Sequence, residues 1–406
     1  MNVPRAVRRL AASRLLRRVA DAAGDTLVFL TGGSLRDRLL GLPSHDLDLV
    51  VDGDPRPVAQ AIAARLGVRC FPLGRPPLVA WRLVTPRVQV DVVGLQGAAV
   101  EADVRRRDFT VNALFWRLPA GPLFDLVGGL EDLAAGRIRV VRPTNLDDDP
   151  LRVLRGLRLA ATRASLRLTA ETELLLAHAA PGLTRVARER VTSELGLLLA
   201  GSGVTRALLA AGRLGLFAPV LPAWQAGVDV SAAAGLAGRL ATLRRGRGAL
   251  TGGAAAVAPA VLAAPAAGFP SRWHEGAAAA ALATAWPERA ARAAARSAAL
   301  GETFAGDLTG PAARALAVDA EEHLTSALAW AAARAATPAA TAAARRLLAW
   351  WRAFANRPPL LPGDEVAGLL RLPRGPARAA AIRELRLAQA RGEIRTAAQA
   401  RRRLAV

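Results

Sequence analysis

The sequence describes a basic, Arg-rich globular protein. It has 406 residues, a length that allows two or three domains. Hydrophobic residues make up 52% of the chain, which excludes wholesale disorder. The net charge of +22 is uneven: residues 1–150 carry 21 Arg against 17 acidic residues, and residues 151–406 carry 34 against 16. This distribution is expected if the second part binds a polyanion. The use of Arg without any Lys is attributed to nucleotide bias in a GC-rich genome.

Cysteine content and apolar segments exclude further classes. The single cysteine, Cys70, rules out an internal disulfide and a Cys-based zinc site. The first twenty residues are Arg-rich and amphipathic, and the apolar run at 26–30 is too short for a signal core or a membrane span. We therefore expect a cytoplasmic protein without membrane association, and nothing in the sequence indicates an obligate protein partner.

Strand and helix patterns divide the chain into two kinds of structure. Short apolar runs alternate with helical patterns up to about residue 141, which predicts a small α/β domain with a mixed sheet. From residue 150 onward Leu, Ala and Arg recur at helical spacing, which predicts an all-helical remainder and an α+β fold class. The predicted strands are 27–30, 47–51, 68–73, 79–84 and 88–93.

The segment from Leu30 to Val50 is the most informative of the chain. Gly32 and Gly33 follow the first strand and precede a helix, so free backbone N–H groups and the positive helix end favour an anion there. Asp46 and Asp48 alternate along the next strand, which places both carboxylates on one face for a divalent metal. Each feature alone is also compatible with a plain tight turn or a solvated acid. Together they give the layout of two-metal nucleotidyl transfer.

This segment resembles the signature GG-x-[VL]-RD-x-LLG-x4-D-x-D of the class II tRNA nucleotidyltransferase and poly(A) polymerase family. The resemblance implies a metal-dependent enzyme in which Asp46 and Asp48 bind Mg²⁺ and Gly33 and Arg36 hold the triphosphate. The matching residues are Gly32, Gly33, Leu35, Arg36, Asp37, Leu39, Leu40, Gly41, Asp46 and Asp48.

Asp91 is a third candidate carboxylate. It lies in the apolar run from Val88 to Val93, where burial of an acid is costly unless a metal or a donor compensates it. If its strand lies beside that of Asp46 and Asp48, the three acids converge. A plain edge-strand Asp is the alternative.

A basic segment follows at 103–113. Taken alone it is a solvated basic turn with Asp108 as a helix cap. It also resembles the family motif D-x3-RRDFT-[IV]-NA, which implies that Arg107 and Asp108 recognise the triphosphate and a ribose hydroxyl. A guanidinium pairs bidentately with phosphate, and a carboxylate accepts from a hydroxyl, so the residue types fit these roles.

The segment that begins at Asp148 predicts a helix start with acids at its positive end. Asp149 and Arg152 are one turn apart, so together they can pair with the edge of a base. The family motif [ED]-D-x2-R, which this segment resembles, implies such a protein template for CTP or ATP. Arg155 and Arg158 drift away from the Asp149 face and are better placed for phosphate or for bracing the pair.

The second half matches the family unevenly. Its histidines, His178, His274 and His323, are too few for the HD phosphohydrolase domain of some relatives, and none precedes an Asp. We predict a catalytic head at 1–140, a helical neck with the template motif at 141–205, and a helical, RNA-binding body and tail at 206–406 that is HD-like but lacks the metal ligands.

The sequence thus predicts a Mg²⁺-dependent enzyme that adds CCA from CTP and ATP to the acceptor end of tRNA. A CC-only or A-only enzyme, a poly(A) polymerase and a non-catalytic RNA-binding relative are the alternatives. Only eleven residues separate Asp91 from Asp103, where relatives often have a longer loop, and this keeps the partial specificities open.

Overall fold

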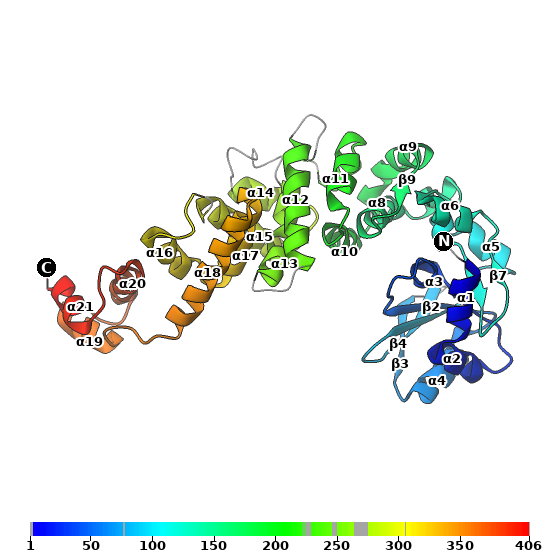
Figure 1. Cartoon of the computed structure of the whole chain (residues 1–406), viewed down its shortest axis with the longest axis horizontal. Coiled ribbons are helices and arrows are strands. Elements are labelled where there is room, and N and C mark those ends of the chain that lie inside the picture. The colour runs from blue at the N-terminus through cyan, green and yellow to red at the C-terminus, as the bar shows by residue number, and fades with distance from the viewer. Residues whose placement is uncertain are drawn as a thin grey trace. The chain divides into compact units, whose positions relative to one another are not determined.

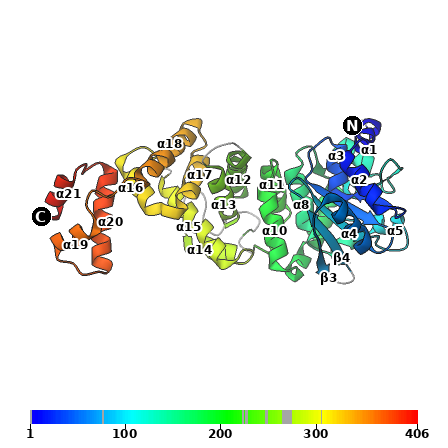
Figure 2. The same cartoon turned by 90° about the horizontal axis from the view of Figure 1, so that it is seen from below.

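The chain forms two compact units, Met1–Val186 and Ala187–Val406, whose elements are labelled in Figures 1 and 2. The computed structural model describes residues 3–75, 78–221, 224, 229–245, 250–263, 275–304 and 306–405. The boundary between the units falls inside the predicted neck at 141–205. The three-part division of the sequence therefore remains a prediction.

A seven-stranded mixed sheet organises the first unit, in the order β3-β4-β5-β2-β1-β6-β7. β2 and β5 are parallel, and the other neighbouring pairs are antiparallel. All five predicted strands are present, each within two residues of its predicted bounds. The strands are β1 (Val28–Thr31), β2 (Asp46–Val51), β3 (Cys70–Arg75), β4 (Leu78–Val84), β5 (Gln89–Gly94), β6 (Phe115–Arg117) and β7 (Leu123–Phe124).

Alternation along β2 separates an apolar face from a partly acidic one. Leu47, Leu49 and Val51 are buried, whereas Asp46 is exposed and Asp48 is half-buried. Because successive side chains of a strand point to opposite faces, the two acids share a face with buried Val50. The acidic part of this face is therefore continuous with an apolar cluster of Phe29, Val50, Val104, Ala113 and Phe115.

The helices of the first unit flank the sheet or follow it. α4 packs on β2 to β5 with its buried residues Val58 and Ile62, and α2 packs on α4. The helices are α1 (Val3–Ala11), α2 (Arg14–Ala23), α3 (Gly32–Leu39), α4 (Pro55–Leu66), α5 (Val100–Arg105), α6 (Gly129–Ala135), α7 (Thr144–Asp148), α8 (Arg152–Thr162) and α9 (Ala170–Ala179), with 3-10 turns at Thr110–Asn112 and Ala180–Arg185.

We expected only helices beyond residue 150, but one strand of a small two-stranded sheet lies there. β8 (Arg137–Ile138) pairs in parallel with β9 (Arg167–Leu168). Two-residue strands carry too little periodicity to be recognised in a sequence, and in this pair β8 packs on α6 and β9 packs on α8.

The secondary structure elements of the second unit are all helices or 3-10 turns within its described residues. Close approach of its helices depends on small side chains: a Cβ on Gly301 would lie 2.7 Å from Trp330, and one on Gly253 would lie 2.3 Å from the carbonyl oxygen of Thr325. The helices are α10 (Arg188–Leu199), α11 (Val204–Arg213), α12 (Val230–Arg245), α13 (Thr251–Val257), α14 (Glu275–Ala283), α15 (Glu288–Phe304), α16 (Pro311–Ala320), α17 (Leu324–Ala335), α18 (Pro338–Ala355), α19 (Gly363–Leu370), α20 (Pro376–Arg391) and α21 (Ala397–Leu404).

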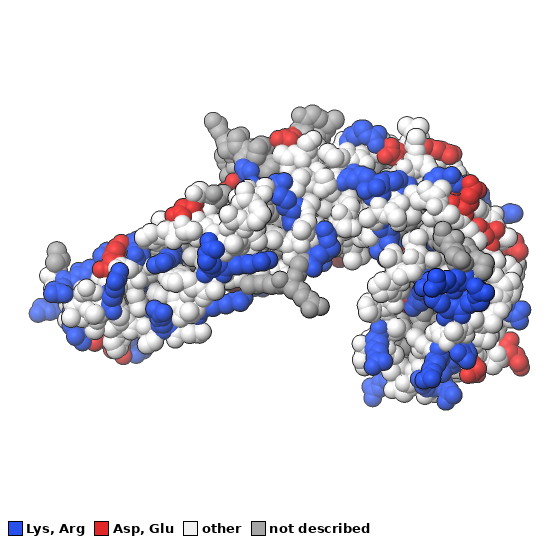
Figure 3. Space-filling view, in the orientation of Figure 1, with Lys and Arg blue, Asp and Glu red and all other residues white. Residues whose placement is uncertain are grey.

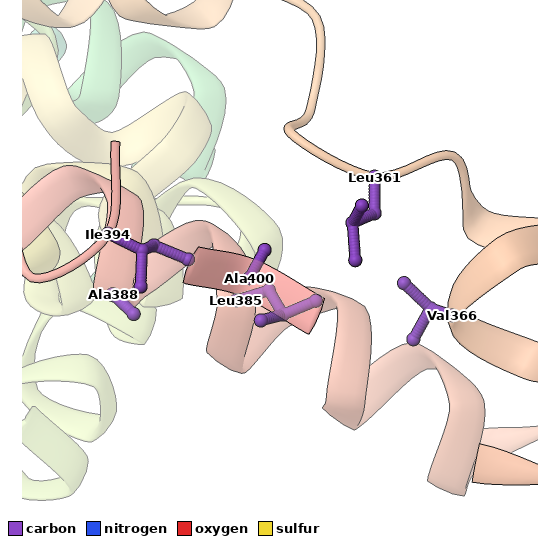
Figure 4. Packing of buried hydrophobic residues seen from close by; sticks show 6 residues of the cluster. All are labelled: Leu361, Val366, Leu385, Ala388, Ile394 and Ala400. Carbon is purple, nitrogen blue, oxygen red and sulfur yellow. The ribbon is translucent and has the colours of Figure 1, made fainter. Parts of the chain in front are cut away.

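The last three helices enclose their own small core. Side chains of the 360–400 segment meet there, as Figure 4 shows. Thr396 begins α21 with a complete capping box to Gln399, which fixes the chain entry into that helix. The buried residues of the cluster are Leu361, Val366, Leu385, Ala388, Ile394 and Ala400.

No helix among the described residues is long and apolar enough to cross a membrane. His178 lies on α9, His323 lies in the 3-10 turn before α17, and His274 is outside the described residues.

Candidate nucleotide-binding site

A row of polar residues crosses four strands on one face of the head sheet. Thr31 on β1 pairs with Asp48 on β2, Asp48 pairs with Asp91 on β5, and Asp91 pairs with Arg82 on β4. Residues that lie directly opposite each other on neighbouring strands point their side chains to the same face of the sheet. The structure therefore brings Asp48 and Asp91 together, as the sequence analysis expected if their strands were neighbours.

Asp48 and Asp91 line a cleft of about 530 Å³ in the first unit. Gly32 and Gly33 at the start of α3 lie on its wall, and Asp46 does not. The remaining lining residues are Thr31, Leu49, Val50, Val79, Ala80, Val93, Gln96, Asp103, Arg106, Arg107, Asp108, Asn112, Arg152 and Arg155.

The carboxylate of Asp48 is held at the N-terminus of α3. Its Oδ2 accepts the Ser34 backbone N–H at 3.2 Å, and the Ser34 hydroxyl accepts the Asp48 backbone N–H at 3.0 Å. Gly32 has a φ of +64°, and a Cβ there would lie 3.0 Å from Asp48 Oδ2. The positive φ and the close approach together explain why a glycine stands at this position.

Charge around Asp48 favours a cation. Burial raises the pKa of the Asp48 carboxyl, and the negative charges of Asp91 and Asp46 act in the same direction. Two neighbouring carboxylates repel each other and are stabilised by a bound cation, and carboxylate oxygens are the ligands that Mg²⁺ prefers. These residues therefore fit a divalent metal, although no group of three or more His, Cys, Asp or Glu side chains is gathered among the described residues.

Asp91 already has a strong partner. Arg82 donates to both of its oxygens, Nε to Oδ1 at 2.7 Å and Nη2 to Oδ2 at 2.8 Å. Both side chains are partly exposed. A guanidinium thus neutralises Asp91 from the side of β4, a partner that the sequence analysis did not identify.

Arg36 lies behind the glycine turn. Its side chain is buried, and it donates from Nε to Asp37 Oδ1 at 2.9 Å and from Nη1 to the side-chain oxygen of Asn112. A Cβ on Gly33 would lie 3.3 Å from its Nη2 atom. Arg36 is therefore adjacent to the glycine turn, and it is absent from the cleft lining.

Three arginines, Arg106, Arg107 and Arg155, form a basic wall of the cleft. Arg107 is held by Asp103, with Nε 2.7 Å from Oδ1, and its guanidinium lies 4.8 Å from the centre of the Phe115 ring. Arg106 and Arg155 line the same wall. Guanidinium groups that line the same cleft as two carboxylates can pair with the oxygens of a phosphate chain.

Asp108 is buried at the base of this wall. Its Oδ1 accepts the Phe109 backbone N–H at 2.7 Å and the Asn112 amide at 3.0 Å, and Arg155 Nη2 lies 3.3 Å from Oδ2. Burial would raise the pKa of Asp108, but Arg155 and these two donors outweigh it and hold the pKa below its usual value. Asp108 is thus ionised and able to accept a further hydrogen bond.

The proposed template residues lie around the start of α8. Arg152 lines the cleft and donates to two backbone carbonyls, of Asn145 and Arg106, both at 2.8 Å. These bonds fix its guanidinium plane. Asp149, the residue after α7, is not on the cleft lining, and of the two later arginines Arg155 lines the cleft and Arg158 does not.

The sequence analysis did not identify three residues that hold other side chains of the site in place. Asn112, although it belongs to the RRDFT-x-NA segment, was not assigned a role; it bridges Arg36 and Asp108. Arg82, which pairs with Asp91, and Arg163, which pairs with Asp37, had no recognisable signal, because each meets its acid only through strand pairing or helix packing.

Family models match both units. Residues 28–93 and 80–139 match the poly A polymerase head domain, and residues 165–227 match the probable RNA and SrmB-binding site of polymerase A. The CC-adding tRNA nucleotidyltransferase of Synechocystis is 38% identical over 191 residues. Residues 28–139 and 165–227 are thus similar to the tRNA nucleotidyltransferase and poly(A) polymerase family.

Relatives within this family differ in what they add. The Synechocystis match covers 47% of this chain and 45% of the relative, and an A-adding enzyme of Deinococcus radiodurans is 39% identical over 48% of this chain and 44% of its own. The chain thus spans about half the length of these curated relatives.

Solved structures share the fold of this chain. The CCA-adding enzyme of Bacillus stearothermophilus in complex with CTP has a TM-score of 0.71 at 22% identity, covering 94% of this chain and 92% of that one. The Thermotoga maritima CCA-adding enzyme complexed with tRNA has a TM-score of 0.67 at 18% identity, covering 98% and 97%. At these identities the likeness shows the fold alone.

Proposed function

We propose that the protein adds CCA, from CTP and ATP, to the 3′ end of tRNA without a nucleic-acid template. The observation that carries this proposal is the in-register pair of Asp48 and Asp91, which line one cleft together with the N-terminus of α3 and the basic wall. The names of the matched relatives support the same chemistry, and the sign of the charge beyond residue 150 suits an RNA partner.

Asp46 and Asp48 are the residues that would hold Mg²⁺, with Asp91 beside them. Bound Mg²⁺ would supply activation of the terminal RNA hydroxyl and neutralisation of the pyrophosphate leaving group. The chain itself positions the reactants. In this proposal the backbone at Gly32 and Gly33 cradles the phosphates.

Arginines and template residues complete the proposed site. Arg107 and Arg155 pair with the triphosphate oxygens, with Arg36 and Arg158 bracing the surrounding structure. Asp108 accepts a ribose hydroxyl. Asp149 and Arg152 read the edge of the base, with the guanidinium of Arg152 fixed in advance by its two carbonyl acceptors.

We propose three functional parts: the head at 1–140, the neck at 141–205, and an RNA-binding body and tail at 206–406. The competing specificities remain CC-only addition, A-only addition and poly(A) synthesis, because matched relatives are named for each of the first two activities as well as for CCA addition.

Incorporation assays separate these activities. tRNA transcripts lacking one, two or three terminal nucleotides are incubated with CTP, ATP or both, and the products are sequenced. We expect two C additions followed by one A. Arrest after two C, A addition to a tRNA ending in CC with no C addition to the shorter transcripts, or long adenylate tails on unrelated RNA would each replace the CCA assignment by the corresponding alternative.

Substitution of Asp48 tests catalysis against RNA binding alone. Asp48→Asn should abolish incorporation and leave tRNA binding intact, because the nucleic acid is held mainly by basic surface. Asp52→Asn, at an exposed acid just beyond the same strand, is the matched control and should retain activity. Full activity in Asp48→Asn would remove this residue from the mechanism.

A further inference from the structure

We infer that helices α1 and α2 form a second RNA-binding surface, which contacts phosphates of the RNA substrate outside the catalytic cleft. This inference rests on the proposed function, since it takes RNA as the partner. The surface is called the N-terminal basic patch and consists of Arg5, Arg8, Arg9, Arg14, Arg17 and Arg18, all exposed.

Charge placement on the head singles out this patch. Residues 1–27 carry six Arg against two Asp, whereas residues 28–140 carry 14 Arg against 12 acidic residues. Most of the positive excess of the head therefore lies on its first two helices. Nucleotide bias raises the Arg content everywhere and does not explain why acids nearly balance Arg over the remainder of the head and not here.

Both helices present their arginines on one side. In α1 the basic residues are spaced i, i+3, i+4, and α2 repeats the same spacing, which aligns each set along one helix face. The opposite faces are buried through Leu10 in α1 and through Leu16 and Val19 in α2. Figure 3 shows Arg side chains gathered over α1.

Helix stability does not account for these positions. Arg5 and Arg14 lie in the first turns of α1 and α2, where a positive charge opposes the helix dipole, and neither first turn carries an acid. Among the described residues, Arg8, Arg9 and Arg14 make no ion pair with a carboxylate and no side-chain hydrogen bond. Their charge is therefore available to a partner.

The chemistry of the patch favours a nucleic-acid backbone over a lipid surface. Interfacial helices bind membranes by inserting an apolar face, and the apolar faces of α1 and α2 are already buried in the head. What remains is a surface of six guanidinium groups, with Asp21 as the one exposed acid on these two helices. Such a surface binds phosphates by charge and by counterion release.

The N-terminal basic patch lies close enough to the catalytic cleft for one RNA to contact both. The N-terminal end of α3 lines the catalytic cleft through Gly32 and Gly33. Its other end, at Leu39 and Leu40, lines a groove of about 670 Å³ together with Arg9 of the patch. A helix of eight residues is about 12 Å long, so the two surfaces are separated by only that distance along α3.

The test compares two triple variants of the full chain with equal charge loss. Arg8, Arg9 and Arg14→Gln removes half of the patch. Arg56, Arg69 and Arg117→Gln removes three exposed arginines from the nearly charge-balanced part of the head and serves as the control. Circular dichroism and thermal unfolding of both variants establish that the fold is retained.

The measurement is the dependence of tRNA affinity on salt, with a tRNA transcript lacking CCA as the probe. Each phosphate that a protein neutralises contributes about 0.7 to 0.9 to the slope of log Kobs against log salt concentration. The patch variant loses three arginines, so its slope should become shallower by about 2 to 3. In the control it should change by less than about 1. Equal slopes in the two variants would overturn the inference.

Two parallel readouts separate this inference from the proposed function. Incorporation of CTP and ATP by the wild-type chain tests the proposed activity. If the chain binds tRNA without incorporating nucleotides, the proposed activity is refuted, and the salt dependence of tRNA binding still tests the patch. Binding to anionic phosphatidylserine vesicles tests the lipid alternative. Loss of vesicle binding with unchanged tRNA binding in the patch variant would assign the patch to a lipid surface instead.

Discussion

Asp37 and Arg163 form a two-pronged ion pair although 126 residues separate them in the chain. Arg163 Nε lies 2.8 Å from Asp37 Oδ1, and Nη2 pairs with Oδ2. Asp37 lies on α3 directly behind the glycine turn, and Arg163 is the residue after α8, the helix that begins with Arg152. The pair therefore connects the proposed phosphate and base-reading elements.

Removal of one partner from this pair should destabilise the first unit. Asp37→Asn leaves the buried guanidinium of Arg36 and that of Arg163 without their anion, so we expect a loss of about 3 kcal/mol in unfolding free energy. Urea denaturation of the full chain measures it. Glu131→Gln, which breaks an exposed pair with Arg137 in the same unit, is the control and should cost less than about 1 kcal/mol.

Acid should remove the contribution of this pair. Burial would raise the pKa of Asp37, but hydrogen bonding and charge from Arg163 and Arg36 outweigh it and hold the pKa below its usual value. A depressed pKa gives stability that is present above the unfolded-state pKa, about 4, and is lost as the pH falls through the folded-state value. The stability difference between wild type and Asp37→Asn should be constant from pH 5 to 7 and should shrink below about pH 4. A constant difference down to pH 2 would contradict this linkage.

Gly32 should be essential for activity beyond its effect on stability. Gly32→Ala combines an unfavourable positive φ with a Cβ 3.0 Å from Asp48 Oδ2, whereas Gly24 has a φ of +59° and open space. Both Ala variants should lose about 1 kcal/mol of stability. Only Gly32→Ala should reduce the incorporation rate, by tenfold or more, because it displaces the Asp48 carboxylate. Equal rates in the two variants would show that the close approach has no catalytic role.

Asp91 and Arg82 should influence metal affinity in opposite directions. Asp91→Asn removes a neighbouring negative charge, so the Mg²⁺ concentration for half-maximal incorporation should rise about tenfold. Arg82→Gln removes the guanidinium that neutralises Asp91, so that concentration should fall by about two- to threefold. Mg²⁺ titrations of both variants measure this. A shift in the same direction would indicate that Asp91 serves only to anchor Arg82.

Base selection should depend on Asp149 more than on its neighbouring acid. Loss of one member of a bidentate base contact costs about 1 to 3 kcal/mol of discrimination. Asp149→Ala should therefore lower the preference for CTP and ATP over UTP and GTP by about 5- to 150-fold in competition assays. Asp147→Ala, at an exposed acid of α7, should keep the preference. Undiminished selectivity in Asp149→Ala would place base reading elsewhere.

Local periodicity was sufficient to predict much of the head. The five strands, the turn at Gly32 and the alternation of Asp46 and Asp48 follow from two-residue spacing and from residues that favour turns, and these are properties of short segments. The small β8–β9 sheet was not predicted, because two-residue strands have no periodicity to detect.

Contacts between distant segments were decided by the tertiary structure alone. The sequence could place Asp91 on a strand, but only the parallel pairing of β2 with β5 sets it beside Asp48, and only the pairing of β4 with β5 supplies Arg82. The link between Asp37 and Arg163 likewise depends on how α8 packs against the head. Local sequence sets which way each side chain points, whereas strand order and helix packing arise from burial of apolar surface across the whole unit, and they determine which polar groups meet.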